Sequence, residues 1–177
     1  GAAFAVWQQT GGKRSFLMDH AYWGPHYSDT DVGSLIESRR TEILGSNCRI
    51  EVIPDENELC RRTAAYVAEG KVIGWFQGRL EWGPRALGNR SILGRADSPT
   101  AVRQINHAIK QRDFWMPFAP TILAERSNEY CDKPKSHVSP YMMMTYTVRS
   151  PKRAALQAAM HPADYSTRPQ ELRPGDN

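Results

Sequence analysis

Residues 72–92 read VIGWFQGRLEWGPRALGNRSI, and this stretch decides the expected fold. Its first five residues form an apolar run without alternation, which predicts a strand buried on both faces. The glycines and proline that follow predict a loop, and residues 91–93 predict a second short strand. Binding loops of α/β proteins commonly follow such strands. We therefore expect a mixed α/β (α+β) protein with a binding loop over residues 77–90.

Three arginines, Arg79, Arg85 and Arg90, directly follow a glycine, a proline and an asparagine in this loop. Planar guanidinium groups hold phosphate and carboxylate groups through paired hydrogen bonds, and main-chain N–H groups near glycines can form a concave nest for the same anion. The alternative is a solvated basic turn whose arginines pair with surface acids. Too few acids lie nearby for that, so the loop predicts an anion-binding site. Glu81 is expected to orient one arginine, because neighbouring cations lower a carboxyl pKa and weaken it as a base.

The positive charge of the chain is concentrated around this loop. Residues 78–112 hold seven lysines and arginines against two acids, a net charge of +5, whereas the whole chain of 177 residues carries only +4. Such a local field suits a small polyanion, and it also suits an RNA strand. Lys110 and Arg112 end the next predicted helix. They either complement the helix dipole or complete the same anion pocket from the opposite side.

Composition and cysteine content restrict the class of protein. A hydrophobic content of 40% is typical of a globular protein, and 177 residues suffice for one domain with a real core. No apolar stretch is long enough to span a bilayer, and the first residues do not show the pattern expected of a leader peptide. The three cysteines match neither a disulfide framework nor a zinc pattern, which favours reduced thiols in a cytoplasmic protein.

Periodicity and cap signals predict the other elements. Strands are expected at 49–53, 118–123 and 141–148, and helices at 1–10, 31–40, 55–70, 98–110 and 125–130, with a short helical piece from residue 154. Asp55 followed by Glu58 resembles a capping box. Val102, Ile105 and Ile109 are expected to face inward from the helix over 98–110. Residues 15–27, rich in aromatic and turn residues, predict an ordered connector.

Several common active-site motifs are missing. The sequence has no Walker loop, GxGxxG, GxSxG or HExxH motif, which disfavours the common nucleotide-binding folds and the usual nucleophilic hydrolases. His20 and His26 lack a metal-ligand spacing, so no metal site is expected in this chain.

Long blocks of the sequence resemble the C-terminal domain of the O-carbamoyltransferase family, of the NodU and antibiotic-carbamoyltransferase type. The matching blocks, which occur in the same order, are QGRLEWGPRALGNRSIL, IKQRDFWMPFAPTIL and SPYMMMTYTVR. DHAYWGPHY and GAAFAVWQQ are similar to the segment after that family's N-terminal Kae1-like (actin-like) domain and to the last helix of that domain. The resemblance implies that residues 1–47 are the end of a Kae1-like domain and a connector. It also implies that residues 48–177 form a YrdC-like domain, a twisted sheet with flanking helices that is incomplete at its C-terminus.

The same resemblance implies an activity and a set of site residues. The domain would bind carbamoyl phosphate and ATP, form a carbamoyl-adenylate with loss of pyrophosphate, and pass the carbamoyl group to the Kae1-like domain for transfer to a hydroxyl acceptor such as a sugar or natural product. A divalent metal, Fe or Mg, is expected only in that N-terminal domain. The residues that fall on the family's basic positions are Arg79, Arg85, Arg90, Lys110 and Arg112; those that fall on ligand-contact positions are Glu81, Asn89, Ser91, His161 and Arg168.

The sequence departs from the family pattern in three places. Met116 replaces a second basic residue before Pro117-Phe118, and His161 is followed by Pro-Ala-Asp rather than Val-Asp-Gly. The chain also stops before an Asn-Thr-Ser-Phe-Asn-like block, so the expectation is a fragment that cannot complete carbamoyl transfer alone. Neither a membrane nor a nucleic acid is the expected partner of the enzyme. The alternative function is a basic nucleotide- or RNA-binding module without catalysis, with Trp75, Trp82 and Trp115 available for stacking.

Overall fold

The fold is described from a computed structural model over residues 2–13, 18–113 and 115–173. It mixes short helices with short strands, which confirms the α/β class. The α-helices are α1 (Ala2–Gln9), α2 (Asp29–Ser38), α3 (Arg40–Gly45), α4 (Glu56–Ala68), α5 (Pro99–Gln104) and α6 (Ser127–Tyr130). A π-helix, η1 (Ile105–Lys110), continues α5, and the 3-10 helices are η2 (Ala124–Arg126), η3 (Ser150–Lys152) and η4 (Ala154–Leu156).

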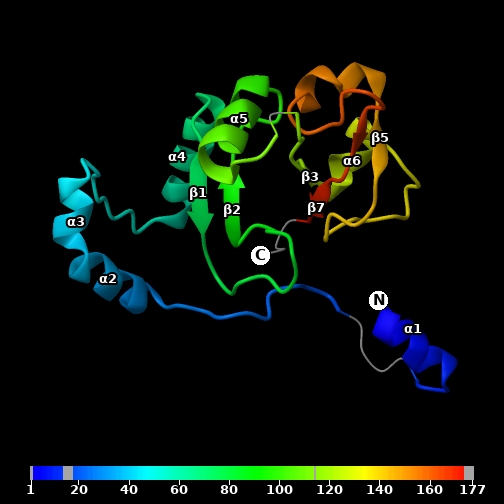
Figure 1. Ribbon diagram of the computed structural model, residues 1–177, viewed down its shortest axis with the longest axis horizontal. Helices are drawn as coiled ribbons and strands as arrows, with labels where there is room; N and C mark the ends of the chain where they lie inside the picture. Colours follow the sequence, from blue (N-terminus) through cyan, green and yellow to red (C-terminus); the bar gives the residue numbers. More distant parts are fainter. Residues whose placement is uncertain (1, 14–17, 114, 174–177) are drawn as a thin grey trace.

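The strands form three small sheets rather than one central sheet. The strands are β1 (Ile73–Phe76), β2 (Arg90–Leu93), β3 (Thr121–Leu123), β4 (Cys131–Asp132), β5 (Tyr146–Val148), β6 (Ser166–Thr167) and β7 (Gln170–Leu172). β1 and β2 pair antiparallel, β3 and β7 pair parallel, and β4, β5 and β6 form an antiparallel sheet. In Figure 1 the β1–β2 hairpin lies with α4 and α5, while the other two sheets lie beside it with α6. The hairpin loop over residues 77–89 projects from the end of this arrangement.

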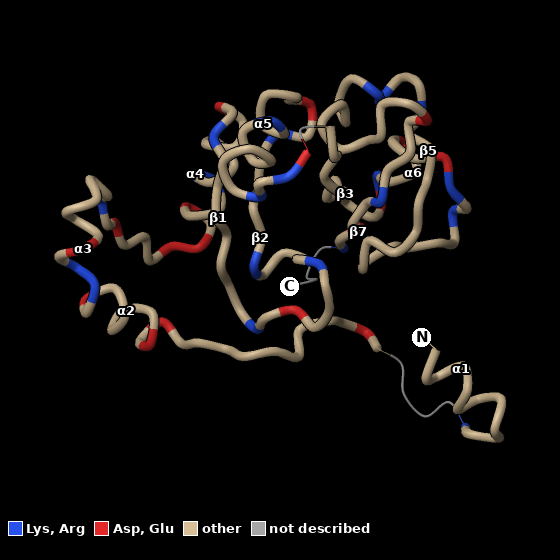
Figure 2. The backbone as a smooth tube through the Cα atoms, viewed as in Figure 1, with Lys and Arg blue, Asp and Glu red and all other residues tan. Residues whose placement is uncertain are grey.

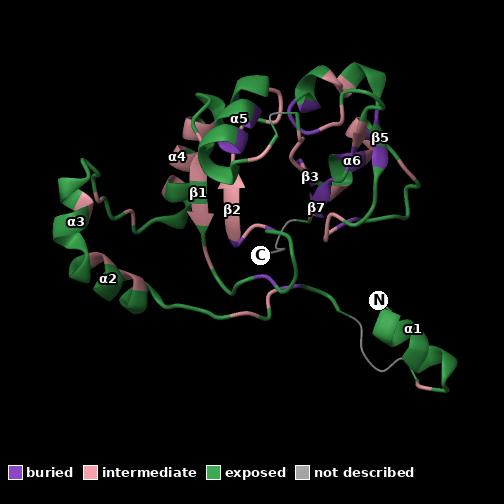
Figure 3. Cartoon of the chain, in the orientation of Figure 1, coloured by how far each residue is buried: buried purple, intermediate pink, exposed green. Residues whose placement is uncertain are grey.

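The core lies in the C-terminal half of the chain. Ile122, Cys131, Tyr146, Val148 and Leu156 form its buried apolar cluster. Helices α1, α2 and α3 contain no buried residue, and Figure 3 shows them almost wholly exposed and apart from the two packed regions. None of the described helices is both long and apolar enough to cross a membrane.

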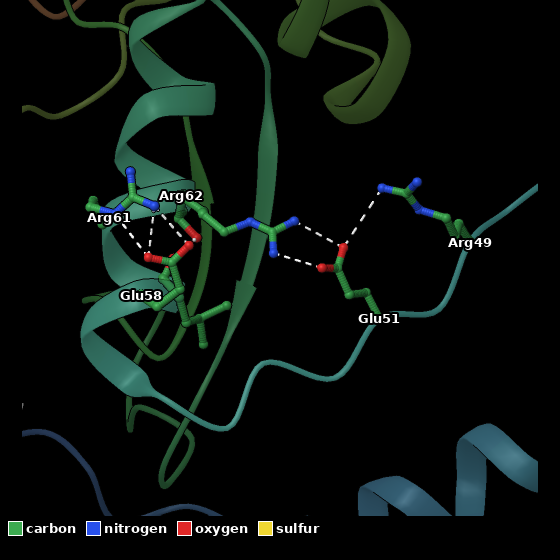
Figure 4. A network of polar contacts seen from close by, with 7 residues as sticks. Arg49, Glu51, Glu58, Arg61 and Arg62 are labelled. Carbon is green, nitrogen blue, oxygen red and sulfur yellow. Dashed lines mark hydrogen bonds and ion pairs between the residues drawn. The ribbon is translucent and has the colours of Figure 1, made fainter.

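The predicted strand at 49–53 is wrong. This segment has no strand partner among the described residues, and Val52 is 83% exposed. Figure 4 shows what holds the segment instead: Glu51 accepts paired hydrogen bonds of 2.6 and 2.9 Å from Arg62 on α4, with Arg49 nearby. An alternation of apolar and polar residues does not make a strand unless a neighbouring strand can receive its main-chain hydrogen bonds.

Helix α4 forms close to its predicted position, but its cap is only partly as predicted. Asp55 is the N-cap, and its carboxylate accepts the main-chain N–H of Asn57 at 2.9 Å. Glu58 does not complete a capping box; it binds Arg61 one turn later, at 2.7 and 2.9 Å. The strand after α4 also differs from its prediction, since β1 alternates between half-buried and exposed residues and Phe76 is 56% exposed.

The predicted helix at 98–110 forms, but its second half is a π-helix. Ser98 is the N-cap, and Val102 and Ile105 are buried as expected. Ile109 is 50% exposed, so its predicted inward orientation is wrong. The wider π turn changes the angle between successive side chains, so residues after Ile105 leave the face that α-helical spacing assigns to them.

Candidate anion-binding site

Glu81 anchors the basic loop between β1 and β2. One of its carboxylate oxygens, Oε1, accepts main-chain N–H groups from Leu87 and Asn89 at 2.7 Å each and from Arg90 at 3.2 Å. Burial of Glu81 opposes its ionisation, but these main-chain donors outweigh burial and lower the pKa of the carboxyl group below its ordinary value. The Glu81 carboxylate therefore binds the main chain of the loop. The sequence had suggested instead that Glu81 orients an arginine side chain.

Asn89 and Ser91 also stabilise the loop from within. Asn89 is buried; its amide group donates to the carbonyl of Arg79 at 2.7 Å and accepts from Gln77 at 3.0 Å. The Ser91 hydroxyl accepts the main-chain N–H of Gly88 at 3.0 Å. The polar atoms that the sequence assigned to phosphate contacts are thus engaged in intramolecular hydrogen bonds.

Arg90 is held at the base of the loop. Its guanidinium group donates to the carbonyls of Gln77, Gly78 and Asn89, and it lies over the Phe76 ring with 3.6 Å between the guanidinium carbon and the ring centroid. A planar group with this many acceptors is fixed in place. Arg90 therefore joins the two ends of the loop.

The tip of the loop is the part that remains available to a ligand. Arg79 and Arg85 are exposed, and their guanidinium groups have no hydrogen-bond or ion-pair partner within the described residues. The main-chain N–H groups of Gly83, Arg85 and Ala86 likewise have no acceptor there. Gly83 has φ +115°, a backbone conformation that favours glycine. A positively charged side chain beside several free N–H groups is a suitable donor set for an oxyanion.

Lys110 ends η1 and Arg112 lies two residues later, but the two side chains make different contacts. Lys110 is exposed, with no partner in the part of the chain that the structure describes. Arg112 donates to the Asn106 side chain at 2.7 Å and lies over the Phe118 ring, 4.5 Å from its centroid. Asn106 is fully buried and donates to the carbonyl of Met116 at 3.0 Å, so Arg112 stabilises the turn after η1.

None of the five predicted cations lines either of two cavities found among the described residues. A cavity of about 560 Å³ lies between α4, the β1–β2 hairpin and α5, and its lining is mainly apolar, with Arg95 as its cation. The second, of about 580 Å³, is lined by residues of β5, η3 and the 129–132 region. Figure 2 shows the basic positions spread along the loop and the neighbouring elements. The candidate anion site is therefore the exposed tip of the loop and not one of these cavities.

His161 and Arg168 lie on either side of β6. The Nδ1 atom of His161 is 3.5 Å from a carboxylate oxygen of Asp164, and Arg168 donates to the Thr145 hydroxyl at 3.1 Å. Neither forms a hydrogen bond or ion pair with the basic loop within the described residues. The link between this region and the loop is Gln170, whose side-chain amide donates to the carbonyl of Leu87 at 2.7 Å. Sequence patterns did not single out Gln170, because a buried glutamine has no local signature.

Comparison with known proteins gives a consistent result. A family model described as "Carbamoyltransferase C-terminus" matches residues 64–177, which is more than half of the chain. The chain is 40% identical over 145 residues to nodulation protein NolNO of Sinorhizobium fredii, covering 81% of this chain and 20% of that protein. It is 35% identical over 164 residues to nodulation protein NolO of Bradyrhizobium diazoefficiens, covering 91% and 28%. Nodulation protein U of Azorhizobium caulinodans is 39% identical over 109 residues, covering 62% and 19%. The chain thus spans less than a third of the length of each of these relatives.

Proposed function

The chain belongs to the carbamoyltransferase C-terminal family, and on this premise we propose that it supplies the site at which an O-carbamoyltransferase binds carbamoyl phosphate and ATP and forms carbamoyl-adenylate. The observation that carries the proposal is the tip of the basic loop, where Arg79, Arg85 and free main-chain N–H groups stand on a backbone anchored by Glu81. These donors suit the phosphates of both substrates.

The proposed reaction places few demands on protein nucleophiles. Water first hydrolyses carbamoyl phosphate to carbamate and inorganic phosphate. This step is needed because the only phosphorus in the product adenylate is the α-phosphorus of ATP. An oxygen of the resulting carbamate then attacks that phosphorus, and pyrophosphate leaves. Such phosphoryl chemistry depends on positioning and on stabilising charge as it develops. Arg79 and Arg85 would supply that charge, with Lys110 as a further exposed cation, while Arg90, Asn89 and Ser91 maintain the loop. Carbamoyl transfer to a hydroxyl acceptor would be completed elsewhere in the whole protein.

Calorimetric titration of the 177-residue chain with carbamoyl phosphate and with ATP tests this proposal. We expect saturable binding, and we expect Arg85→Ala to weaken it at least tenfold, since a charge-assisted hydrogen bond contributes about 1.5–3 kcal/mol. Arg126→Ala is the matched control, because Arg126 is exposed and pairs with Glu129 on α6. Absence of binding by the unaltered chain, or equal weakening by the two variants, would overturn the proposal.

One feature favours the alternative of a nucleic-acid-binding module. Trp82 is 73% exposed and lies three residues before Arg85, so it could stack on a base beside a basic group. Titration with single-stranded oligonucleotides of increasing length distinguishes the two functions. An RNA-binding module would bind longer strands more tightly, and its affinity would fall steeply with salt. The carbamoyltransferase function requires ATP to bind more tightly than an oligonucleotide of similar charge.

A further inference from the structure

The carbonyl of Leu87 receives hydrogen bonds from two distant parts of the chain. The Tyr22 hydroxyl donates to it at 3.1 Å and the Gln170 side-chain amide donates at 2.7 Å. Leu87 and Gln170 are both buried. A carbonyl oxygen has two lone pairs, so these two donors satisfy it completely. Leu87 also donates its own N–H to Glu81, which fixes the residue from both sides of its main chain.

The segment that carries Tyr22 lies along the basic loop. Gly24 N–H donates to the Leu80 carbonyl at 2.8 Å, and Leu80 N–H donates to the Pro25 carbonyl at 2.9 Å. Trp82 N–H donates to the Ala21 carbonyl at 2.6 Å. The contact is close, since a Cβ atom on Gly24 would lie 2.7 Å from the Cβ of Leu80. Residues 21–25 therefore support the first half of the loop.

Gln170 is fixed just as firmly on the opposite side. It belongs to β7, which pairs with β3, and its N–H donates to the Pro120 carbonyl at 2.9 Å. The next residue, Glu171, is fully buried and bound to Lys133. Gln170 can therefore present its amide to Leu87 without rearranging.

We infer that Tyr22 and Gln170 are positioning residues for the proposed anion site, acting together through the Leu87 carbonyl. This inference rests on the proposed function. The main-chain N–H groups of residues 83, 85 and 86 make no hydrogen bonds to the described residues. The position of the tip therefore depends on the hydrogen bonds at either end of it, at residues 80–82 and at Leu87. Arg85 lies two residues before Leu87. Holding Leu87 therefore restricts where the guanidinium group can lie, and a preorganised loop loses less entropy when it binds.

Tyr22→Phe, Gln170→Met and the double variant test this inference, because each single change removes one donor and keeps a side chain of similar size. We expect each single variant to weaken binding of carbamoyl phosphate or ATP about fivefold, in line with one hydrogen bond. The double variant should weaken binding by more than the product of the two single-variant factors, because the buried Leu87 carbonyl then has neither of its two donors. Matched controls are Tyr27→Phe, an exposed tyrosine on the same connector, and Gln157→Met, an exposed glutamine after η4.

Amide hydrogen exchange gives a second readout that needs no ligand. In the double variant, exchange at the N–H groups of Leu87, Asn89 and Arg90 should quicken, while exchange in β5 and the melting temperature stay near those of the unaltered chain. Unchanged exchange at these groups would overturn the inference, and so would slower or faster exchange spread evenly over the molecule. If the unaltered chain binds neither ligand, the proposed function fails, and the exchange result then decides alone whether Tyr22 and Gln170 fix the loop.

Discussion

Glu81 stabilises the basic loop through one carboxylate oxygen that accepts three main-chain N–H groups. We expect Glu81→Gln to lower the free energy of unfolding at pH 7 by about 1–3 kcal/mol, because the neutral amide is a weaker acceptor for these buried donors. The folded-state pKa of Glu81 is lowered, so its contribution is complete above the ordinary carboxyl pKa of 4.5 and is lost as the pH falls through the folded-state value. Urea unfolding from pH 7 to pH 3 measures both effects.

Glu125→Gln is the control for this experiment, since Glu125 is exposed and has no hydrogen-bond or ion-pair partner among the described residues. Its variant should unfold as the unaltered chain does at every pH. Two results would contradict the assigned role of Glu81. One is an unchanged free energy of unfolding of the Glu81→Gln variant at pH 7; the other is a difference in unfolding free energy from the unaltered chain that grows below pH 4.

The cysteines should differ sharply in reactivity. Cys131 is fully buried, and burial, assisted by the nearby Glu171 and partly offset by Lys133, raises the pKa of its thiol to about 11. Cys48 and Cys60 are exposed. Because the thiolate is the reactive form, iodoacetamide at pH 8 should modify Cys48 and Cys60 in the folded chain and Cys131 only after denaturation. Peptide mass spectrometry checks this, and rapid modification of native Cys131 would show that the core is open.

The sequence identified the basic loop but not how each of its arginines is used. The glycines and proline made the loop recognisable, and the lack of nearby acids pointed to free guanidinium groups, which Arg79 and Arg85 have. Arg90 differs because its acceptors are main-chain carbonyls, two of them on the opposite side of the hairpin. Main-chain carbonyls occur at every residue, so no residue type in the sequence marks them as partners.

At the scale of elements, local signals were reliable where they described local hydrogen bonds. Helices α4 and α5 begin at capping residues that the sequence displays, Asp55 and Ser98. The strand at 49–53 failed because pairing depends on a distant partner, and β7 escaped notice because its neighbour β3 lies about fifty residues earlier in the chain. The connection of residues 21–25 to the basic loop is of the same kind and was equally hidden.

Gly24→Ala tests that connection as an element. The new Cβ would lie 2.7 Å from the Leu80 Cβ and 2.8 Å from the Leu80 carbonyl oxygen, so the two segments must separate. We expect a loss of about 1–3 kcal/mol in the free energy of unfolding, measured by urea denaturation. Gly33→Ala in α2 is the matched control: nothing lies within 4 Å of its Cβ, and alanine favours a helix by about 1 kcal/mol. Equal stability of the two variants would mean that residues 21–25 do not pack on the loop.

At the scale of the whole molecule, a buried ion pair joins two segments that are far apart in the chain. The Nζ atom of Lys133 lies 2.5 and 2.6 Å from the carboxylate oxygens of Glu171, and both side chains are almost completely buried. Lys133→Met should cost about 3–5 kcal/mol, because it leaves a buried carboxylate without its cation and with only the Ser139 N–H as a described donor. Adding Glu171→Leu should recover much of that loss. Urea denaturation of the single and double variants measures both changes.

Lys135→Met is the control for the ion pair, because Lys135 is exposed two residues further along and has no ion-pair partner within the described ranges. It should leave stability almost unchanged. A Lys133→Met variant as stable as this control would show that the pair contributes nothing to the fold.

The position of residues 21–25 against the basic loop has a practical consequence for truncation. A shortened protein confined to the family match, residues 64–177, would keep every arginine of the basic loop. It would nevertheless lack residues 21–25, which hydrogen-bond to the main chain of Leu80 and Trp82. If residues 21–25 position the loop as we infer, a protein expressed with the family match as its boundaries would keep the sequence motif but not the arrangement of its free guanidinium groups. Weak ligand binding by that shorter protein would then not count against binding by the longer chain.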